Sequence, residues 1–449
     1  MSRLFFLGVF GLAAMLTLPG QIGGSVFSLE LWEADNRYGY YFPDTANSQL
    51  KPFVANPEEA GLAPSLHATR MALALQKKLS SFPLLQLWVY RASEWPHKLS
   101  RRQQKYRLIA MPFSRNFGWS RDSVPRWHGD ERRDSLEDFH WGLYDRESAY
   151  LDSLLYQNPG WLVLKSAGNS LGEYFSGLHY VKDYERADWQ PSEKIRQVDG
   201  GEHLYDCLPP LATAKNVVTV GAAFNWEGAA EIRRVINSGV GPSDDGRIKP
   251  DLLAYGVQTS QAVVALSAQC VYLMRHFEKV YGRFPWAFEM RNLLITSAKA
   301  LGEEVSPNYR SGYGLFDSLS AHTTISKQRC WCDTLRPGNS EWTLELKLTG
   351  QRAFALGLAW HDPPANRNAG RPLVADLNLT ALPAERSQWI EAKTLDPAKP
   401  ALGPKATGNS RDNYEQLSIA KAGRYTISVK NAGAKISAPV AFSLCLVAN

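Results

Sequence analysis

Cysteine is scarce in this sequence, and its spacing is not that of a metal site. The 449 residues include five cysteines, an odd number that cannot all pair within one monomer. Cys330 and Cys332 are separated by a single residue, which suits neither the usual zinc spacing nor a thioredoxin-type redox pair. The sequence therefore argues against a structural zinc site, predicts no cofactor, and leaves the disulfide pairing open.

The sequence also lacks a strong excess of charge and, after its first segment, any long apolar run. Fifty Lys and Arg against 44 Asp and Glu give a net charge of +6 over the whole chain, which is too little to predict a nucleic-acid partner. Beyond residue 24 no run reaches the about 18 consecutive apolar residues of a membrane span. We therefore expect no nucleic-acid partner, and no membrane contact beyond the N-terminal segment.

Residues 1–24 have the pattern of a secretory signal peptide. Arg3 supplies a positive charge, and the apolar run Leu4–Leu18 ends at Pro19 and Gly20. No clean Ala-x-Ala cleavage pattern follows, so an uncleaved N-terminal membrane anchor is the alternative. Either assignment predicts a secreted or cell-envelope protein.

The composition, with 44% hydrophobic residues, is sufficient for a large core, and the length predicts more than one domain. Between Leu29 and Ala321, short apolar runs alternate with helical patterns, which predicts an α/β fold with a mostly parallel sheet. The runs Trp161–Leu164 and Val217–Val220 predict buried strands. The tract Leu79–Asp134 is rich in Arg, Trp, Ser and Pro, and we expect long surface loops there around one or two short strands.

After Cys332 the pattern changes to that of an antiparallel β-sandwich. The strand-like segments Trp342–Leu348, Ala355–Trp360 and Tyr425–Val429 are separated by clusters of Pro, Gly and Asn. The stretch Glu385–Asp412 is expected to be a loop within this domain. The predicted division is a leader at 1–24, an α/β domain at 25–328 and a jelly-roll-like sandwich at 333–449.

Four short segments carry the residue types of nucleophilic serine catalysis. In chain order they are Leu29–Asp35, Leu66–Ala72, Ser166–Ser170 and Thr259–Ala262. They resemble, in the same order, four segments of the subtilisin-like serine peptidases (subtilases): the strand that ends in the triad acid, the His-Gly/Ala-Thr helix start, the Ala-Ala-Gly-Asn oxyanion segment and the Gly-Thr-Ser-x-Ala nucleophile segment. The resemblance implies the three-layer subtilisin-like fold for residues 25–328 and makes this the peptidase domain.

Further segments extend the resemblance over nearly the whole chain after Leu29. Those in the α/β region are Ala214–Ala222, Asn237–Pro242, Asp245–Asp251 and Ser311–Leu315. Those past the boundary, which are similar to a sandwich appended to one branch of secreted bacterial subtilases, are Trp360–Pro364, Leu373–Leu379 and Asp412–Glu415. Each segment alone is weak evidence for the resemblance, but the occurrence of all of them in the order found in the family is specific.

The resemblance implies a role for each candidate site residue. Ser260 is the nucleophile, His67 the general base and later the acid, and Glu33 the carboxylate that orients the imidazole. Asn169 donates its side-chain amide to the oxyanion, and the Ser260 backbone N–H at a helix start supplies a second donor. Each residue has a simpler alternative: His67 as a capping or core residue, Ser260 as a helix cap, Asn169 as a turn residue and Glu33 as a solvated strand-end carboxylate.

The sequence departs from the family pattern at three places. Glu33 stands where the family has Asp, and Asp35, which faces the same side of the strand, is the fallback acid. The family's hairpin-length stretch before the nucleophile is missing between Gly256 and Thr259, and Gln258 replaces a glycine. Only residues 21–28 lie between the end of the apolar run at Pro19–Gly20 and the first predicted strand, so we expect no pro-segment of the usual length.

The leading expectation is a secreted, monomeric serine endopeptidase that acts on protein or peptide substrates through an acyl-enzyme. The alternative is a catalytically impaired pseudoprotease that keeps the scaffold as a binding or structural module. Calcium is common in the family, but no loop of the EF-hand type is present, and Asp376 or Asp412 is only a guess as a ligand.

Overall fold

The structure is a computed structural model. It describes residues 27–33, 42–56, 64–82, 85–100, 104–121, 124–133, 136–183, 188–226, 231–339, 341–350, 353–365, 371–433 and 438–448. The candidate leader at residues 1–24 and the fallback acid Asp35 lie outside these ranges.

A mostly parallel sheet forms the centre of the first domain. Its strands are, in spatial order, β12 (Ala298–Lys299), β13 (Leu315–Phe316), β11 (Leu252–Tyr255), β9 (Val218–Phe224), β6 (Trp161–Ser166), β3 (Tyr106–Met111), β1 (Phe27–Glu33) and β2 (Leu87–Arg91), and β10 (Arg233–Arg234) pairs with β9. All neighbours from β13 to β2 pair in parallel, whereas β12 and β10 pair antiparallel with their neighbours. The predicted parallel sheet is confirmed.

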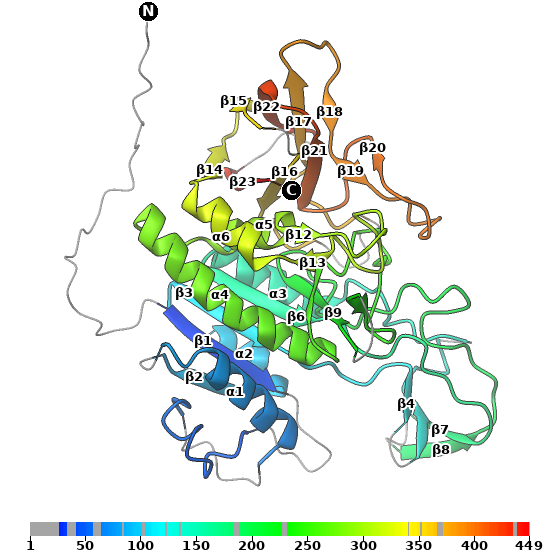
Figure 1. Cartoon of the computed structure of the whole chain (residues 1–449). Helices are drawn as coiled ribbons and strands as arrows, with labels where there is room; N and C mark the ends of the chain where they lie inside the picture. The colour runs from blue at the N-terminus through cyan, green and yellow to red at the C-terminus, as the bar shows by residue number, and fades with distance from the viewer. Residues whose placement is uncertain are drawn as a thin grey trace, which may run out of the picture.

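Helices cover both faces of this sheet. Side chains alternate between the faces along each strand, so each face presents apolar side chains that a layer of helices buries. Leu29 and Leu31 belong to the core under α1 (Leu66–Lys78), α4 (Thr259–Tyr281), α5 (Ala287–Thr296) and α6 (Ser318–Ser326). Trp32 belongs to the core on the opposite face, under the 3₁₀ turn Ala92–Glu94, α2 (Trp95–Ser100) and α3 (Arg146–Gln157). Figure 1 shows α1 and α4 together on one side of the sheet. The three-layer α/β fold is therefore confirmed.

The expectation of surface loops over Leu79–Asp134 is wrong in its middle part. β3 is a central strand, and all six of its residues are buried. The buried Arg107 in this strand donates to Glu30 of β1 from Nε and Nη2 at 2.6 and 2.5 Å, and its guanidinium lies 4.2 Å from the Trp161 ring centroid. The sequence pattern did not predict this buried strand because it contains the charged Arg107, whose partner Glu30 lies on another strand.

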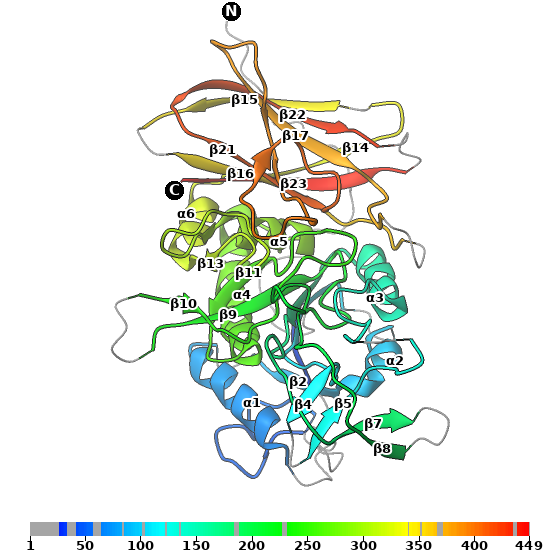
Figure 2. The ribbon, with the colours of Figure 1, turned by 90° about the vertical axis from the view of Figure 1, so that its right-hand side faces the viewer.

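Two insertions build a small separate sheet. β4 (Trp119–Arg121) and β5 (Pro125–Trp127) follow β3, and β7 (His179–Asp183) and β8 (Asp188–Ser192) follow β6. Figure 2 shows this sheet at the end of the molecule opposite the sandwich.

The second domain is an antiparallel sandwich, as predicted. One sheet has the order β14 (Cys330–Leu335), β23 (Val440–Ala448), β16 (Phe354–Trp360) and β21 (Tyr414–Ile419); the other has β15 (Glu341–Leu348), β22 (Gly423–Asn431), β17 (Leu377–Pro383) and β18 (Ile390–Glu391). Its apolar side chains form a core between the two sheets. The expected loop Glu385–Asp412 contains β18 and the short pair β19 (Lys393–Thr394) and β20 (Lys405–Ala406).

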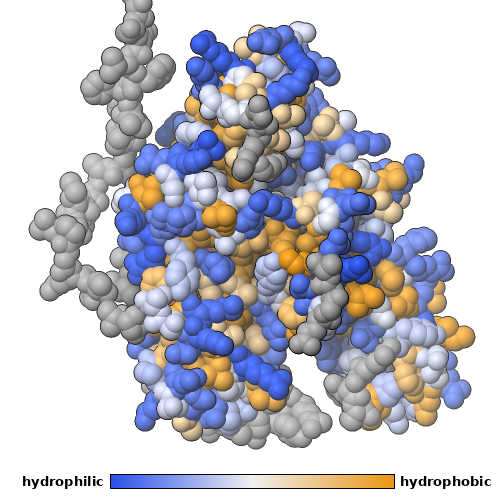
Figure 3. Space-filling view, viewed as in Figure 1, coloured by the Kyte–Doolittle hydropathy of each residue, from blue (hydrophilic) through white to orange (hydrophobic). Residues whose placement is uncertain are grey.

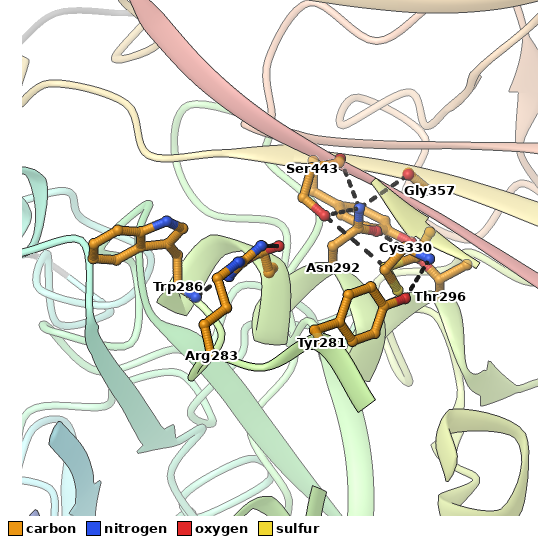
Figure 4. The surroundings of a disulfide bond; sticks show 11 residues. Tyr281, Arg283, Trp286, Asn292, Thr296, Cys330, Gly357 and Ser443 are labelled. Atoms are coloured by element: carbon orange, nitrogen blue, oxygen red, sulfur yellow. Dashed lines mark hydrogen bonds and ion pairs between the residues drawn. A yellow bond between two sulfur atoms is a disulfide. The ribbon is translucent and has the colours of Figure 1, made fainter. Parts of the chain in front are cut away.

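Helix α5 joins the two domains. All 10 of its residues are buried, and it packs against β16 and β23 of the sandwich. The Asn292 amide donates to the Gly357 and Ser443 carbonyls at 3.0 and 2.7 Å, and Figure 4 shows it pointing between them. A disulfide between Cys330 and Cys445 lies beside this contact and links the first and last strands of the sandwich.

Candidate active site

The first pair of candidate residues is Glu33 with His67. Glu33 is the last residue of β1 and faces the same side of the sheet as Leu29 and Leu31, which is the side of α1. The Ser65 hydroxyl caps α1 by accepting from the Ala68 N–H at 3.3 Å, which places His67 in the first turn. His67 Nδ1 lies 2.8 Å from Glu33 Oε2, so the carboxylate fixes the tautomer and orientation of the imidazole.

Burial differs sharply within this pair. The Glu33 side chain is 2% exposed and the His67 side chain 44%. Burial raises the pKa of Glu33, although the hydrogen bond from His67 acts in the opposite direction. The hydrogen bond to Glu33 raises the pKa of His67 above its usual value, although partial burial opposes it. Because Nδ1 is engaged and Nε2 has no hydrogen bond to the described residues, Nε2 is the nitrogen able to accept a proton.

Ser260 occupies the first turn of α4. The first backbone hydrogen bond of this helix runs from the Ala262 N–H to the Gln258 carbonyl at 3.1 Å, so the Ser260 N–H has no partner within the helix. Ser260 is 4% exposed, and its hydroxyl forms no hydrogen bond within the described ranges, including none to His67. The helices that carry the two residues nevertheless pack against each other.

Asn169 is held beside the nucleophile segment. Its Oδ1 accepts from the Thr259 N–H at 3.0 Å and from the Thr259 hydroxyl at 3.1 Å. A backbone N–H can only donate, so the accepting atom must be the amide oxygen, and the Nδ2 group is left as a donor without a hydrogen bond to the described residues. The structure therefore brings together Glu33 with His67, and Asn169 with the Thr259–Ser260 segment.

The segment Asn237–Pro242, singled out in the sequence, supports Asn169 from behind. Asn237 Nδ2 donates to the Asn169 carbonyl at 3.2 Å, and the Gly239 N–H donates to the Gly168 carbonyl at 2.9 Å. A Cβ on Gly239 would lie 2.0 Å from the Ala167 carbonyl oxygen, so only glycine permits this approach. The backbone of the oxyanion segment is thus fixed by a second loop.

Lys165 is a buried residue beside the site that the sequence analysis missed. Its Nζ donates to the Phe113 carbonyl and, at 3.1 and 3.0 Å, to the Ser166 carbonyl and hydroxyl. Burial lowers the pKa of Lys165 to about 7. The lysine ties the segment after β3 to the end of β6, from which Asn169 follows. The feature of the sequence that could have indicated a buried lysine is the single charge of Lys165 directly after the apolar run Trp161–Leu164.

The connection before Ser260 is as short as the sequence indicates. β11 ends at Tyr255 and α4 begins at Thr259, so residues 256–258 form the whole link. A Cβ on Gly256 would lie 2.5 Å from the Ala262 nitrogen, which shows how closely this turn packs on the first turn of α4. The short link therefore fixes the position of Ser260 relative to the sheet.

The described residues offer no cluster of three or more His, Cys, Asp or Glu side chains suited to a metal ion. Asp412 accepts from the Ile248 N–H and from Asn409 Nδ2 at 3.0 and 2.9 Å, so both of its oxygens are used by the protein. None of the helices within the described ranges combines the length and apolar character needed to cross a bilayer.

Comparisons with known proteins give likenesses among solved structures. No protein-family model and no curated protein matches the chain. The prenylagaramide maturation protease PagA is similar at 14% identity and a TM-score of 0.41, over 68% of this chain and 95% of PagA. The patellamide maturation protease PatA is similar at 14% and 0.41, over 68% and 98%. Tripeptidyl peptidase 2 is similar at 9% and 0.34, over 86% and 40%. With TM-scores this low, what the chain does must be argued from its own residues.

Proposed function

We propose that this chain is a secreted subtilisin-like serine endopeptidase that hydrolyses peptide bonds through an acyl-enzyme on Ser260. The observation that carries the proposal is the 2.8 Å hydrogen bond between His67 and the buried Glu33, with the second imidazole nitrogen left available. A carboxylate that fixes one nitrogen of a half-exposed imidazole is the arrangement that activates a serine hydroxyl.

In the proposed reaction, His67 Nε2 takes the Ser260 proton as the hydroxyl attacks the scissile carbonyl. Glu33 stabilises the imidazolium that forms, and His67 then protonates the leaving amine. In the second half of the reaction, His67 takes a proton from a water molecule, which attacks the acyl-enzyme. The peptide acid is released, and the proton returns to Ser260. Ser260 makes no hydrogen bond to His67 within the described residues, so the proposal requires this contact to form when substrate binds, as catalytic contacts commonly tighten then.

Two donors are available for the oxyanion. One is the Ser260 N–H, which precedes the first hydrogen bond of α4. The other is Asn169 Nδ2, which stays available as a donor because Thr259 engages only the amide oxygen. Asn237 and Gly239 hold the backbone of Gly168 and Asn169, and Asn169 in turn accepts from Thr259 next to Ser260, so the donors need little reorganisation as charge develops.

The substrates in this proposal are proteins or peptides, the working form is a monomer, and calcium is not assigned to any residue. Secretion is inferred from the leader pattern at residues 1–24 alone.

Turnover of a quenched fluorescent peptide mixture by the purified full chain tests the proposal. The wild type and Ser267→Ala should both hydrolyse it, whereas Ser260→Ala should lose the activity. Ser267 is a matched control because it is a buried serine on the same helix, whose hydroxyl only donates to the Val263 carbonyl at 2.8 Å. Absence of hydrolysis by folded wild type would leave the scaffold as a binding module, and equal hydrolysis by Ser260→Ala would show that Ser260 is not the nucleophile.

A further inference from the structure

An open cavity lies beside the start of the nucleophile helix and has no role in the mechanism above. Its volume is about 520 Å³, and Tyr255, Leu315 and Phe316 are among its lining residues, at the ends of β11 and β13. Figure 3 shows an apolar area on this face, where Figure 1 has β12 and β13. The cavity therefore offers apolar walls at the edge of the sheet.

The cavity is within reach of a peptide bound at Ser260. Tyr255 precedes Ser260 by five residues, and five residues of chain span at most about 18 Å. The Gly256 turn is packed tightly on the first turn of α4, which shortens the separation further. Since an extended peptide advances about 3.3 Å per residue, a side chain within about five positions of the cleaved bond can enter the cavity.

The charges in the cavity leave one carboxylate without a partner. Lys299 forms an ion pair with Asp317, and Asp317 also caps α6 by accepting from the Leu319 and Ser320 N–H groups at 2.9 and 3.2 Å. Glu231 is exposed and forms no ion pair or hydrogen bond within the described residues. Its Oε2 lies 4.0 Å from the position that a Cβ on Gly302 would take, so the carboxylate lies near Gly302, another residue that lines the cavity.

Three other residues that line the cavity suit an aliphatic stem. Tyr255 is 50% exposed, and its hydroxyl has no partner in the described part of the chain. Its ring and the apolar side chains of Leu315 and Phe316 offer a surface along which the methylene groups of a long side chain can lie. A cation at the tip of that side chain would meet Glu231, and an aromatic face within reach adds to its attraction.

We propose that this cavity is a substrate subsite that receives a Lys or Arg side chain of the peptide held across Ser260. The proposal rests on the proposed peptidase function, because it takes the bound molecule to be a peptide. Glu231 is then a specificity residue that contacts the substrate side chain, and Tyr255 packs against the stem of that side chain.

Binding to a full-length Ser260→Ala chain tests the subsite without requiring turnover. The probes are fluorescein-labelled peptides of uniform length in which one arginine or one norleucine occupies each position in turn, and fluorescence anisotropy gives Kd. At one position or more, arginine should bind about threefold to fivefold more tightly than norleucine, as expected for a partly exposed ion pair. The preference should shrink as ionic strength rises.

Matched second substitutions decide whether Glu231 is responsible. Glu231→Gln should abolish the arginine preference, whereas Glu303→Gln should keep it, because Glu303 is a nearby exposed carboxylate that does not line the cavity. An arginine preference that survives Glu231→Gln, or no preference at any position, would overturn the subsite. Peptide cleavage by wild type is measured separately. Cleavage without an arginine preference would overturn only the proposed subsite, whereas a Glu231-dependent preference without cleavage would overturn only the proposed peptidase activity.

Discussion

Asn292 and Lys215, at the interface between the two domains, differ from the residues of the candidate active site in how their buried polar groups are used. At the interface, Asn292 engages both ends of its amide: Nδ2 donates to two carbonyls, and Oδ1 accepts from the Thr296 hydroxyl at 2.8 Å. Lys215 likewise donates to Asp362 and to the Pro363 and Pro372 carbonyls. At the site, Glu33 Oε1 is buried without a partner, and Asn169 Nδ2 and the Ser260 hydroxyl make no hydrogen bond within the described ranges.

This contrast separates stability from activity. A buried polar group with a full set of partners contributes to the folded state, whereas one left without partners costs stability and calls for an explanation. The explanation proposed here is that Asn169 Nδ2 binds the oxyanion of the substrate and that the Ser260 hydroxyl gives its proton to His67 as it attacks, whereas the buried Glu33 Oε1 does not meet the substrate. Substitutions at the interface should therefore lower mainly the free energy of unfolding, and substitutions at the candidate site should lower mainly kcat.

His67→Gln should give the largest effect on activity with little effect on stability. We expect kcat/KM to fall by about 10⁴-fold or more, because the general base is lost. The free energy of unfolding should change by less than about 1 kcal/mol, since a glutamine amide can still donate to Glu33. Peptide hydrolysis and urea unfolding measure the two quantities. A large loss of stability with activity retained per folded molecule would reverse the comparison.

Lys215→Met should give the converse result at the interface. Removing the cation leaves Asp362 buried without its partner, at a cost of about 3–5 kcal/mol in the free energy of unfolding. The matched control is Lys430→Met: the ion pair of Lys430 with Glu341 has side chains 50% and 41% exposed, so its loss should cost less than about 1 kcal/mol. Equal costs for the two variants would contradict the account of the interface.

Asn169→Ala should lower kcat by about 10²-fold to 10³-fold without a matching change in KM, because the oxyanion bond forms only in the transition state. Asn169→Asp is a second variant, since it keeps an oxygen that accepts from Thr259 but replaces the donor by a negatively charged acceptor, which should lower kcat at least as much. If Asn169→Asp retains kcat, then Asn169 acts as a structural cap of α4 and not as an oxyanion donor.

Glu33→Gln should move the acid limb of the pH profile of kcat/KM to lower pH. Glu33 raises the pKa of His67, and the base must be neutral to work, so removing the carboxylate lets neutral His67 persist at lower pH. Asp35→Asn should leave this limb unchanged. If Asp35→Asn abolishes turnover and Glu33→Gln does not, the acid has been assigned to the wrong residue.

The fold could be predicted wherever the pattern is local. Runs such as Trp161–Leu164 are apolar throughout and form the expected buried strands. β3 could not be found in this way, because the charge on Arg107 is compensated by Glu30, 77 residues away in sequence. Similarly, Lys165 interrupts an apolar strand and is satisfied by the Phe113 carbonyl, which no local pattern reveals.

The candidate site was predictable as a set of residues but not as a geometry. The order of the four segments identified Glu33, His67, Asn169 and Ser260, and the contact between Glu33 and His67 agrees with the roles that the resemblance implies. Their catalytic roles stay predictions. The orientation of Asn169 depends on a hydrogen bond from Thr259, 90 residues later, and the relation of Ser260 to His67 depends on how α1 packs against α4. Such distances are set by tertiary packing, which the sequence pattern does not encode.

Labelling of the full-length chain with a fluorophosphonate, followed by intact mass measurement, tests the central claim most directly. The reagent reacts with a serine only when a neighbouring base activates it. The account predicts one adduct per molecule, located on Ser260, absent from Ser260→Ala and strongly slowed in His67→Gln. A folded wild-type chain that acquires no adduct, or one whose adduct persists in Ser260→Ala, would contradict it.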